Sequence, residues 1–213
     1  MKNYIKSTGI AICSFYGVIA LAGIYQILAN KLGLYNSSIS RIIWIFQDVI
    51  CCIAMLYIGI NKFIKPSMLG RIGASILSLM FALFAVNLVL SFADIDILTS
   101  INQYFGITIS IVELCAAALL FYSIKAWMPM RISAFVYWIP CLCSSFYLSK
   151  IKMATELAHN TSDWALLDKI VNAAITCDYF AFAIAMLTIV FTVIWMIKKP
   201  ITPHVQSNPI NII

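Results

Sequence analysis

Long apolar stretches separated by short polar connections make up most of the chain. The six stretches run over residues 9–29, 42–60, 72–93, 105–125, 132–149 and 173–197. Each is close to the roughly 20 residues that a helix needs to cross a hydrocarbon core about 30 Å thick. A helix also satisfies its own backbone polar groups, as lipid requires. The pattern predicts an all-α, polytopic integral membrane bundle of about six transmembrane helices.

The fifth stretch is the shortest and contains Pro140 near its middle. Proline lacks a backbone N–H, so a carbonyl in the preceding turn loses its helical donor. In a membrane, a neighbouring helix or a cavity must satisfy that carbonyl. We therefore expect other parts of the bundle to meet the fifth helix at this point.

The only long polar connection covers residues 150–172. Within it, Thr161, Ser162 and Asp163 have the side chains of a helix cap, and apolar residues follow from Trp164. This pattern fits either an interfacial turn or a lead-in to the sixth helix. No Gly/Ser-rich or Pro-rich linker divides the chain, so we expect one transmembrane domain over residues 1–213, with residues 198–213 as a short cytoplasmic tail.

Lysine and arginine residues flank the apolar stretches unevenly. With the N-terminus inside, the nine on the cytoplasmic side are Lys2, Lys6, Lys62, Lys65, Arg71, Lys125, Arg131, Lys198 and Lys199. The five on the opposite side are Lys31, Arg41, Lys150, Lys152 and Lys169. Short cytoplasmic loops retain basic residues, so nine against five predicts that both ends lie in the cytoplasm (N-in/C-in).

Composition excludes several classes of protein. Hydrophobic residues make up 63% of the chain and charged residues only 10%, against roughly 25% charged in a soluble domain. Lipid is therefore the expected solvent and a principal partner. The net charge of +6 comes largely from residues that flank the apolar stretches, which suits anionic headgroups. Because no basic stripe with interleaved aromatics occurs, we expect no nucleic-acid partner.

Cysteine and histidine give no sign of a cofactor. The seven cysteines lie in apolar stretches, where small core residues are common, and Cys141 and Cys143 are spaced on different helix faces, unlike a CxxC motif. His159 and His204 both fall outside the stretches, so an intramembrane haem or zinc site has no histidine ligands. We expect no cofactor and no metal site.

Three acids, Asp48, Glu113 and Asp178, are the only ones within the six stretches. Each follows the start of an even-numbered stretch by five to eight residues, which places all three about 8 to 12 Å below the outer edge. We call these three residues the acid layer. Successive acids are 65 residues apart, since 113 − 48 and 178 − 113 give the same value. This regularity fits either a repeated helical hairpin or hairpins that merely have similar lengths.

The surroundings of the acid layer indicate a polar site inside the bundle. In two of the predicted helices, small and polar residues lie on the same face as the acid, which is typical of a face that packs against another membrane helix. Beside Glu113 these residues are Gly106, Ser110 and Ala117, and beside Asp178 they are Ala174, Ala181, Ala185, Thr188 and Thr192. An ionised acid in mid-bilayer costs about 2.5 to 3.5 kcal/mol, and no basic partner lies within the stretches. The acids must then stay protonated, share protons, face water or coordinate a cation. Further polar residues that could join the site are Gln26, Gln47, Asn87, Ser91, Ser110, Ser144 and Ser145.

No motif in the chain names a family, and none points to catalytic residues. Length and hydropathy are similar to those of small six-helix bacterial transporters, a likeness that carries no residues across; we therefore expect a bacterial inner (cell) membrane. The first hypothesis is a small transporter or channel-like protein in which Asp48, Glu113 and Asp178, with Gln47, Ser110 and Asn87, bind a cation, a proton or a small solute. It would form a homo-oligomer if six helices cannot enclose a path.

Two other hypotheses remain open from the sequence. In the second, the chain is a membrane scaffold or accessory subunit, and its acids fix helix packing or bind a partner subunit. In the third and weakest, it is an intramembrane enzyme that acts on lipid through acid–base chemistry, although no nucleophile with an adjacent base is visible. Poor tolerance of neutral substitutions at all three acids for activity, with folding intact, would favour the first hypothesis.

Overall fold

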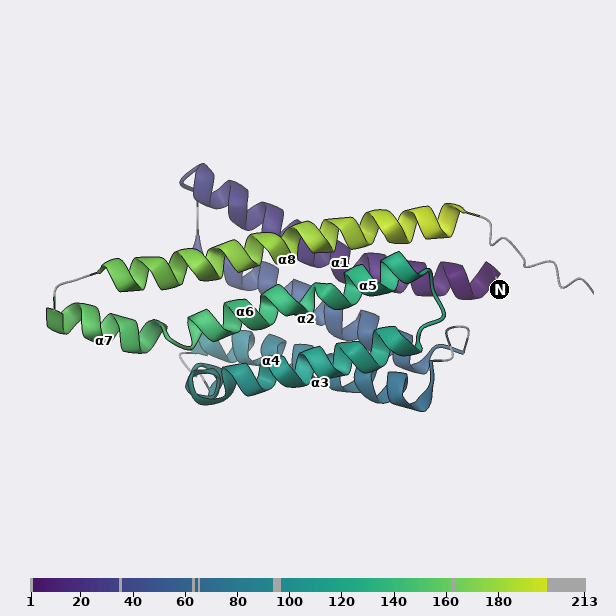
Figure 1. Cartoon of the computed structure of the whole chain (residues 1–213), viewed down its shortest axis with the longest axis horizontal. Helices are drawn as coiled ribbons and strands as arrows, with labels where there is room; N and C mark the ends of the chain where they lie inside the picture. Colours follow the sequence, from purple (N-terminus) through teal and green to yellow (C-terminus); the bar gives the residue numbers. More distant parts are fainter. Residues whose placement is uncertain are drawn as a thin grey trace, which may run out of the picture.

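The computed structural model describes residues 2–34, 36–62, 64, 66–93, 97–161 and 164–198. Within these residues the secondary structure is helical, and the predicted all-α bundle is confirmed. The elements are α1 (Lys2–Lys31), α2 (Ser37–Ile60), α3 (Met68–Leu90), the 3-10 turn η1 (Ser91–Ala93), α4 (Ile97–Ser123), α5 (Met128–Val136), α6 (Trp138–Leu148), α7 (Ile151–Thr161) and α8 (Ala165–Ile197). Most of the helices lie along one long axis (Figure 1).

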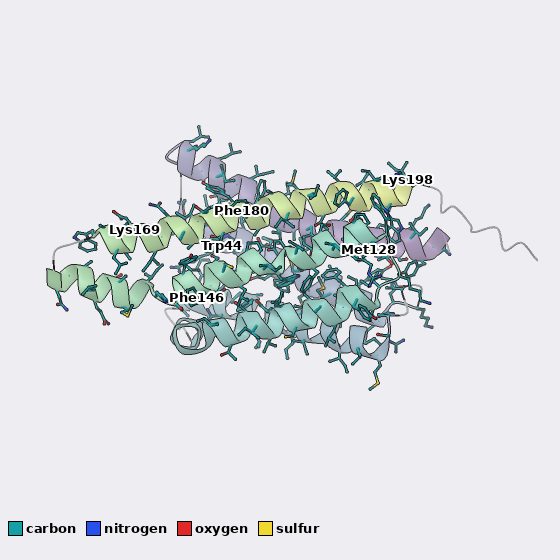
Figure 2. The ribbon with its side chains drawn as sticks, viewed as in Figure 1. Trp44, Met128, Phe146, Lys169, Phe180 and Lys198 are labelled. Atoms are coloured by element: carbon teal, nitrogen blue, oxygen red, sulfur yellow. The ribbon has the colours of Figure 1, made fainter. Side chains whose placement is uncertain are left out.

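Six stretches of the described chain are long and apolar enough to cross a membrane. They cover Asn3–Ala29, Ser37–Ile60, Met68–Ala93, Gly106–Ser123, Met128–Asn160 and Ala165–Ile197. The start of α1 and the end of α8 lie at the same end of the bundle, at the right of Figure 1. We call this the inner end, after its predicted cytoplasmic side, and the opposite end the outer end. Figure 2 shows Met128 and Lys198 toward the inner end, and Phe146 and Lys169 toward the outer end.

The fifth span is divided into α5 and α6 at Tyr137. Pro140 has no N–H for the carbonyl of Val136, four residues earlier, and α5 ends at Val136. Tyr137 keeps helical backbone angles (φ −50°, ψ −36°), so the two helices continue in nearly the same direction. The break is therefore local, and it places Tyr137 and Trp138 at the middle of the span.

The polar connection over residues 150–172 was predicted to be a loop, but most of it is helical. Residues 151–161 form helix α7, and α8 begins at Ala165 rather than near residue 173. The apolar residues after Trp164 are thus the lead-in to the sixth helix, and Asp168 in the first turn suits the positive end of the helix dipole. At 1.5 Å per residue α8 is about 50 Å long. Together with α7 it extends beyond the rest of the bundle at the outer end (Figure 1).

Ser162 and Asp163 of the expected cap, and residues 199–213 of the expected tail, lie outside the described residues.

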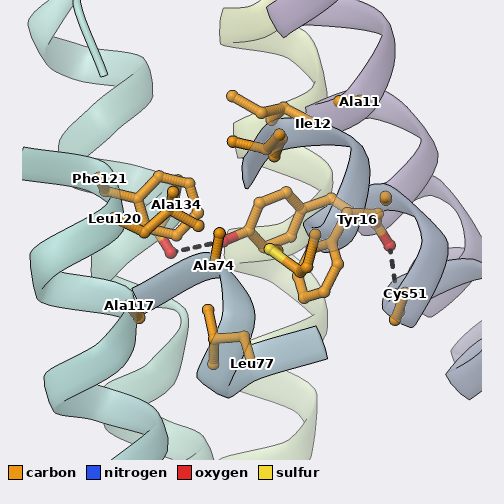
Figure 3. Packing of buried hydrophobic residues seen from close by; sticks show 14 of the residues in the cluster. Ala11, Ile12, Tyr16, Cys51, Ala74, Leu77, Ala117, Leu120, Phe121 and Ala134 are labelled. Atoms are coloured by element: carbon orange, nitrogen blue, oxygen red, sulfur yellow. Dashed lines mark hydrogen bonds between the residues drawn. The ribbon is translucent and has the colours of Figure 1, made fainter. Parts of the chain in front are cut away.

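The helices pack around one apolar core. Helix α2 packs against α3, α3 against α4, α1 against α2 and α8, and α6 against α4 and α8. The largest fully buried side chains include Phe15 and Tyr16 of α1. Tyr16 lies among core residues of α2, α3, α4 and α5 (Figure 3). The Tyr16 hydroxyl donates a 2.5 Å hydrogen bond to the carbonyl of Ala134, two residues before the end of α5. A neighbouring helix therefore supplies a polar contact close to the break in the fifth span.

Replacing Tyr16 with phenylalanine should lower the free energy of unfolding by about 1 to 2 kcal/mol, because the ring stays and a buried hydrogen bond is lost. Thermal unfolding of the purified protein in a neutral detergent measures the change. Tyr57→Phe is the matched control, since Tyr57 is 39% exposed on α2. Equal effects of the two substitutions would contradict a specific role for the Tyr16 hydroxyl.

Candidate functional site: the acid layer

Asp48 is the most deeply buried member of the acid layer. Its side chain is only 7% exposed, on the face of α2 that also buries Cys51 and Met55. The side chain of Gln47, half-buried beside it, is within hydrogen-bonding reach of the carboxyl group. The structure thus directs Asp48 into the bundle, and Gln47 lies next to it.

Glu113 faces the same region from α4. The residue is half-buried, and its carboxyl group is close enough to Asp48 for the two to interact electrostatically. One turn toward the outer end, Ser110 is buried and donates a 2.7 Å hydrogen bond to the Ser145 hydroxyl of α6. Glu113 thus interacts electrostatically with an acid of α2, and Ser110 contacts α6 directly.

Asp178 is placed differently from the expectation of a buried face. Ala174, Ala181, Ala185, Thr188 and Thr192 of the same stripe are all buried, whereas Asp178 is exposed. Its carboxyl group is within reach of the Ser144 hydroxyl on α6. It also lines a cavity of about 180 Å³ between α1 and α8, with Gly23, Gln26, Ile27, Ile175, Tyr179 and Phe182. The cavity explains the exposure, because α1 does not close over α8 at this level.

Cys141 links the acids into one polar layer. From α6, this residue interacts electrostatically with both Glu113 and Asp178. Sequence reasoning treated Cys141 as a small core residue and missed this position. A signal was present, since Cys141, Ser144 and Ser145 follow one another at helical spacing after Trp138. The acids of α4 and α8 thus both interact with a polar face of α6, and Asp48 of α2 interacts with Glu113.

Asn87 lies on α3, half-buried and one turn before the end of that helix. Ser91, which follows the helix, donates its hydroxyl to the carbonyl of Leu88. Both residues lie toward the outer end, as predicted from their depth, but the contacts described above come from α2, α4, α6 and α8 rather than from α3.

The apolar core lies entirely on the inner side of the acid layer in the four helices that build it. On α2 the core runs from Cys51 to Ile58, and on α4 from Ala116 to Ile124. In the fifth span it ends at Trp138, and α8 contributes Ala185. The polar layer is therefore the boundary between a more open outer part and a tightly packed inner part of the bundle.

Three aromatic rings close the centre of the bundle directly below this boundary. Phe15 of α1, Phe81 of α3 and Trp138 of α6 form a triangle, with ring centroids 5.5 to 6.3 Å apart. All three residues are less than 9% exposed. Tyr16 and Tyr137 pack edge-on beside them, 5.3 Å apart. We call Phe15, Phe81 and Trp138 the aromatic plug.

The charge of the acid layer has no basic counterpart at its own depth. The sequence contains no Lys or Arg over residues 42–61, 106–124, 132–149 or 170–197, which cover the helices around the acids. Among the residues that the structure describes, no three His, Cys, Asp or Glu side chains gather closely enough to hold a metal ion. The arrangement suits protons or a singly charged cation held between separated carboxyl groups better than a tightly coordinated divalent ion.

Six helices long and apolar enough to cross a membrane indicate an integral multi-pass membrane protein. No protein-family model, no curated protein and no solved structure matches the chain. Function must therefore be argued from the site itself.

Proposed function

We propose that the protein is a small membrane transporter whose acid layer binds a proton or a singly charged cation during passage of a solute. The observation that carries this proposal is a chain of electrostatic contacts among three helices: Glu113 of α4 interacts with Asp48 of α2, and Cys141 interacts with Glu113 and with Asp178 of α8. The sequence has no Lys or Arg within these spans. Acids placed this way in transporters and pumps serve proton relays and ion sites. A packing role alone would not require three separate helices to contribute an acid to one level.

In this proposal the path would open on the outer side of the acid layer and be closed on the inner side. Asp178 is exposed and lines the cavity between α1 and α8, whereas the aromatic plug fills the centre immediately below. Alternating access requires a barrier that moves across a fixed site. The break between α5 and α6 adjoins Trp138 of the plug, and we assign the moving barrier to this segment.

Thermal stability of the purified protein, measured with and without individual monovalent and divalent cations, tests the proposal. We expect one cation to raise the Tm of wild type by several degrees, because a ligand that binds only the folded state stabilises it. Asp48→Asn and Glu113→Gln should remove that gain, and Asp178→Asn should reduce it. Asp168→Asn is the matched control, since Asp168 is exposed in the first turn of α8, outside the acid layer.

If the acid layer binds protons and no other cation, added cations will not change the Tm. Proton flux into proteoliposomes that contain a pH-sensitive dye is then the second measurement. Wild type should carry protons, and Asp48→Asn should abolish that flux while the folded fraction is unchanged. If no ion matters, no proton moves and the neutral variants are as stable as wild type, the acids are packing devices or partner contacts. The scaffold hypothesis would then stand, with the exposed Asp178 as the contact for a basic residue of a partner.

A further inference from the structure

A second site lies at the inner end, away from the acid layer. An apolar groove of about 500 Å³ runs between α4 and α5 and is open at the surface of the bundle. Its lining residues are Ala118, Phe121, Tyr122, Met128, Arg131, Ile132 and Phe135. Tyr122, Met128 and Ile132 are 84%, 67% and 49% exposed. The groove therefore faces the hydrocarbon of the bilayer along most of its length and ends near the membrane surface.

Arg131 is the only charged residue of the groove, and its position is fixed. Its guanidinium donates to the carbonyls of Phe121 and Tyr122, at 2.8 and 2.6 Å, and lies 5.8 Å from the centre of the Tyr122 ring. These contacts hold the side chain at the C-terminal end of α4, where the helix dipole favours a cation. A guanidinium has five N–H donors, so these two bonds leave others to point elsewhere.

The positive charge at the inner end has no acidic counterpart anywhere in that part of the sequence. All eight acids of the chain are Asp48, Asp94, Asp96, Glu113, Glu156, Asp163, Asp168 and Asp178. Asp48, Glu113 and Asp178 form the acid layer, and Glu156 and Asp168 lie in α7 and at the start of α8, toward the outer end. In the sequence, Asp94, Asp96 and Asp163 fall in the connections predicted at the outer end. Lys125, exposed in the turn between α4 and α5, adds to the positive charge beside Arg131. An anion from outside the chain would therefore meet net positive charge at this site.

We propose that the groove between α4 and α5 binds one anionic phospholipid, with an acyl chain along Phe121, Ile132 and Phe135 and its phosphate on Arg131. The apolar lining matches a hydrocarbon chain, and the fixed guanidinium at the membrane surface matches a phosphate oxygen. Basic pockets between transmembrane helices on the cytoplasmic side are the usual place for such headgroups. The occupant is a lipid rather than free phosphate, because the groove extends away from the charge into the hydrocarbon.

Arg41 provides an internal comparison at the outer end. It also donates to a carbonyl at a helix end, that of Ser91 at 3.3 Å, and its guanidinium also lies 5.8 Å from an aromatic ring, that of Phe92. The two arginines therefore have similar helix-capping roles. Only Arg131 combines helix capping with a place in the groove between α4 and α5. If stabilisation by anionic lipid depends on Arg131 but not on Arg41, helix capping in general does not account for it.

The test measures the Tm of purified, delipidated protein with added phosphatidylglycerol, and with phosphatidylcholine of the same acyl chains. For wild type we expect a rise on the order of 5 °C with phosphatidylglycerol at about one hundred times its Kd, and a much smaller rise with phosphatidylcholine. Arg131→Gln should lose the difference between the two lipids, and Arg41→Gln should keep it. Ala118→Phe, which fills the groove and leaves Arg131 unchanged, should also lose it.

Soluble glycerol phosphate separates headgroup from chain and should leave the Tm unchanged. The proposal is overturned if the two lipids stabilise wild type equally, if Arg131→Gln retains the preference, or if glycerol phosphate alone reproduces the effect. Because Arg131→Gln could itself weaken the fold, native mass spectrometry of the retained lipid gives an independent measurement. Wild type and Arg41→Gln should each retain one phosphatidylglycerol molecule, and Ala118→Phe should retain none.

Discussion

Gly73→Leu should lower the free energy of unfolding by at least about 3 kcal/mol, equivalent to a Tm about 6 to 12 °C lower for a chain of this size. A Cβ at Gly73 would lie 2.4 Å from the carbonyl oxygen of Ala116 and 3.1 Å from the backbone nitrogen of Leu120. These backbone atoms of α4 cannot rotate away as a side chain can. Helices α3 and α4 would have to separate, and the packing that holds Glu113 at its level would be lost.

Gly17→Leu is the matched control for this prediction. Gly17 also lies within a transmembrane helix, but a Cβ there would meet no atom within 4 Å. Thermal unfolding in detergent should therefore show little or no destabilisation for Gly17→Leu. If Gly73→Leu and Gly17→Leu have equal Tm values, the close approach of α3 and α4 is not a determinant of the fold.

Trp138→Ala should produce the second large effect, on stability and on permeability together. Removing a buried tryptophan typically costs about 3 to 5 kcal/mol. Trp138 packs against Phe15 at 6.1 Å and Phe81 at 6.3 Å, between ring centroids, so its loss opens the aromatic plug. Hydrophobic constrictions block ions by excluding water. We therefore expect proteoliposomes with Trp138→Ala to pass protons faster than wild-type proteoliposomes do.

The control for this experiment is Trp127→Ala, outside the plug. Trp127 contacts Phe191 at 5.7 Å and the ammonium group of Lys198 at 5.3 Å, near the inner end. It should lose stability without a leak. If Trp138→Ala does not fold, Phe81→Leu tests the same barrier, because it makes one ring position of the aromatic plug smaller but keeps it apolar. Tight vesicles with both Trp138→Ala and Phe81→Leu would mean that the barrier lies elsewhere.

Several features followed from local chemistry and could be predicted. The length and apolar character of the six stretches predicted an all-helical bundle, which the structure has, because lipid permits few other ways to satisfy a backbone. Pro140 predicted a disturbed fifth helix because its missing N–H is a property of the residue itself. The acids could be placed at one depth because helical rise converts residue number into distance.

The polar connection was harder to predict, because helix formation over residues 151–161 depends on packing against α8. Its sequence is polar enough to pass for a loop, and the helix gains stability from its neighbour rather than from its own propensity. Packing between α7 and α8 also explains why α8 begins at Ala165 and not near residue 173.

The position of each acid along its helix was thus determined by the sequence, whereas the surroundings of each acid were decided only by the tertiary structure. The sequence predicted that Asp48, Glu113 and Asp178 lie at one level. It did not indicate that Asp48 would be buried and Asp178 exposed beside the cavity between α1 and α8. The electrostatic contacts of Cys141 with Glu113 and Asp178 likewise depend on how α4, α6 and α8 pack together. The physical reason is that helical periodicity defines faces within one helix, whereas the neighbour that each face meets depends on the packing of all the others.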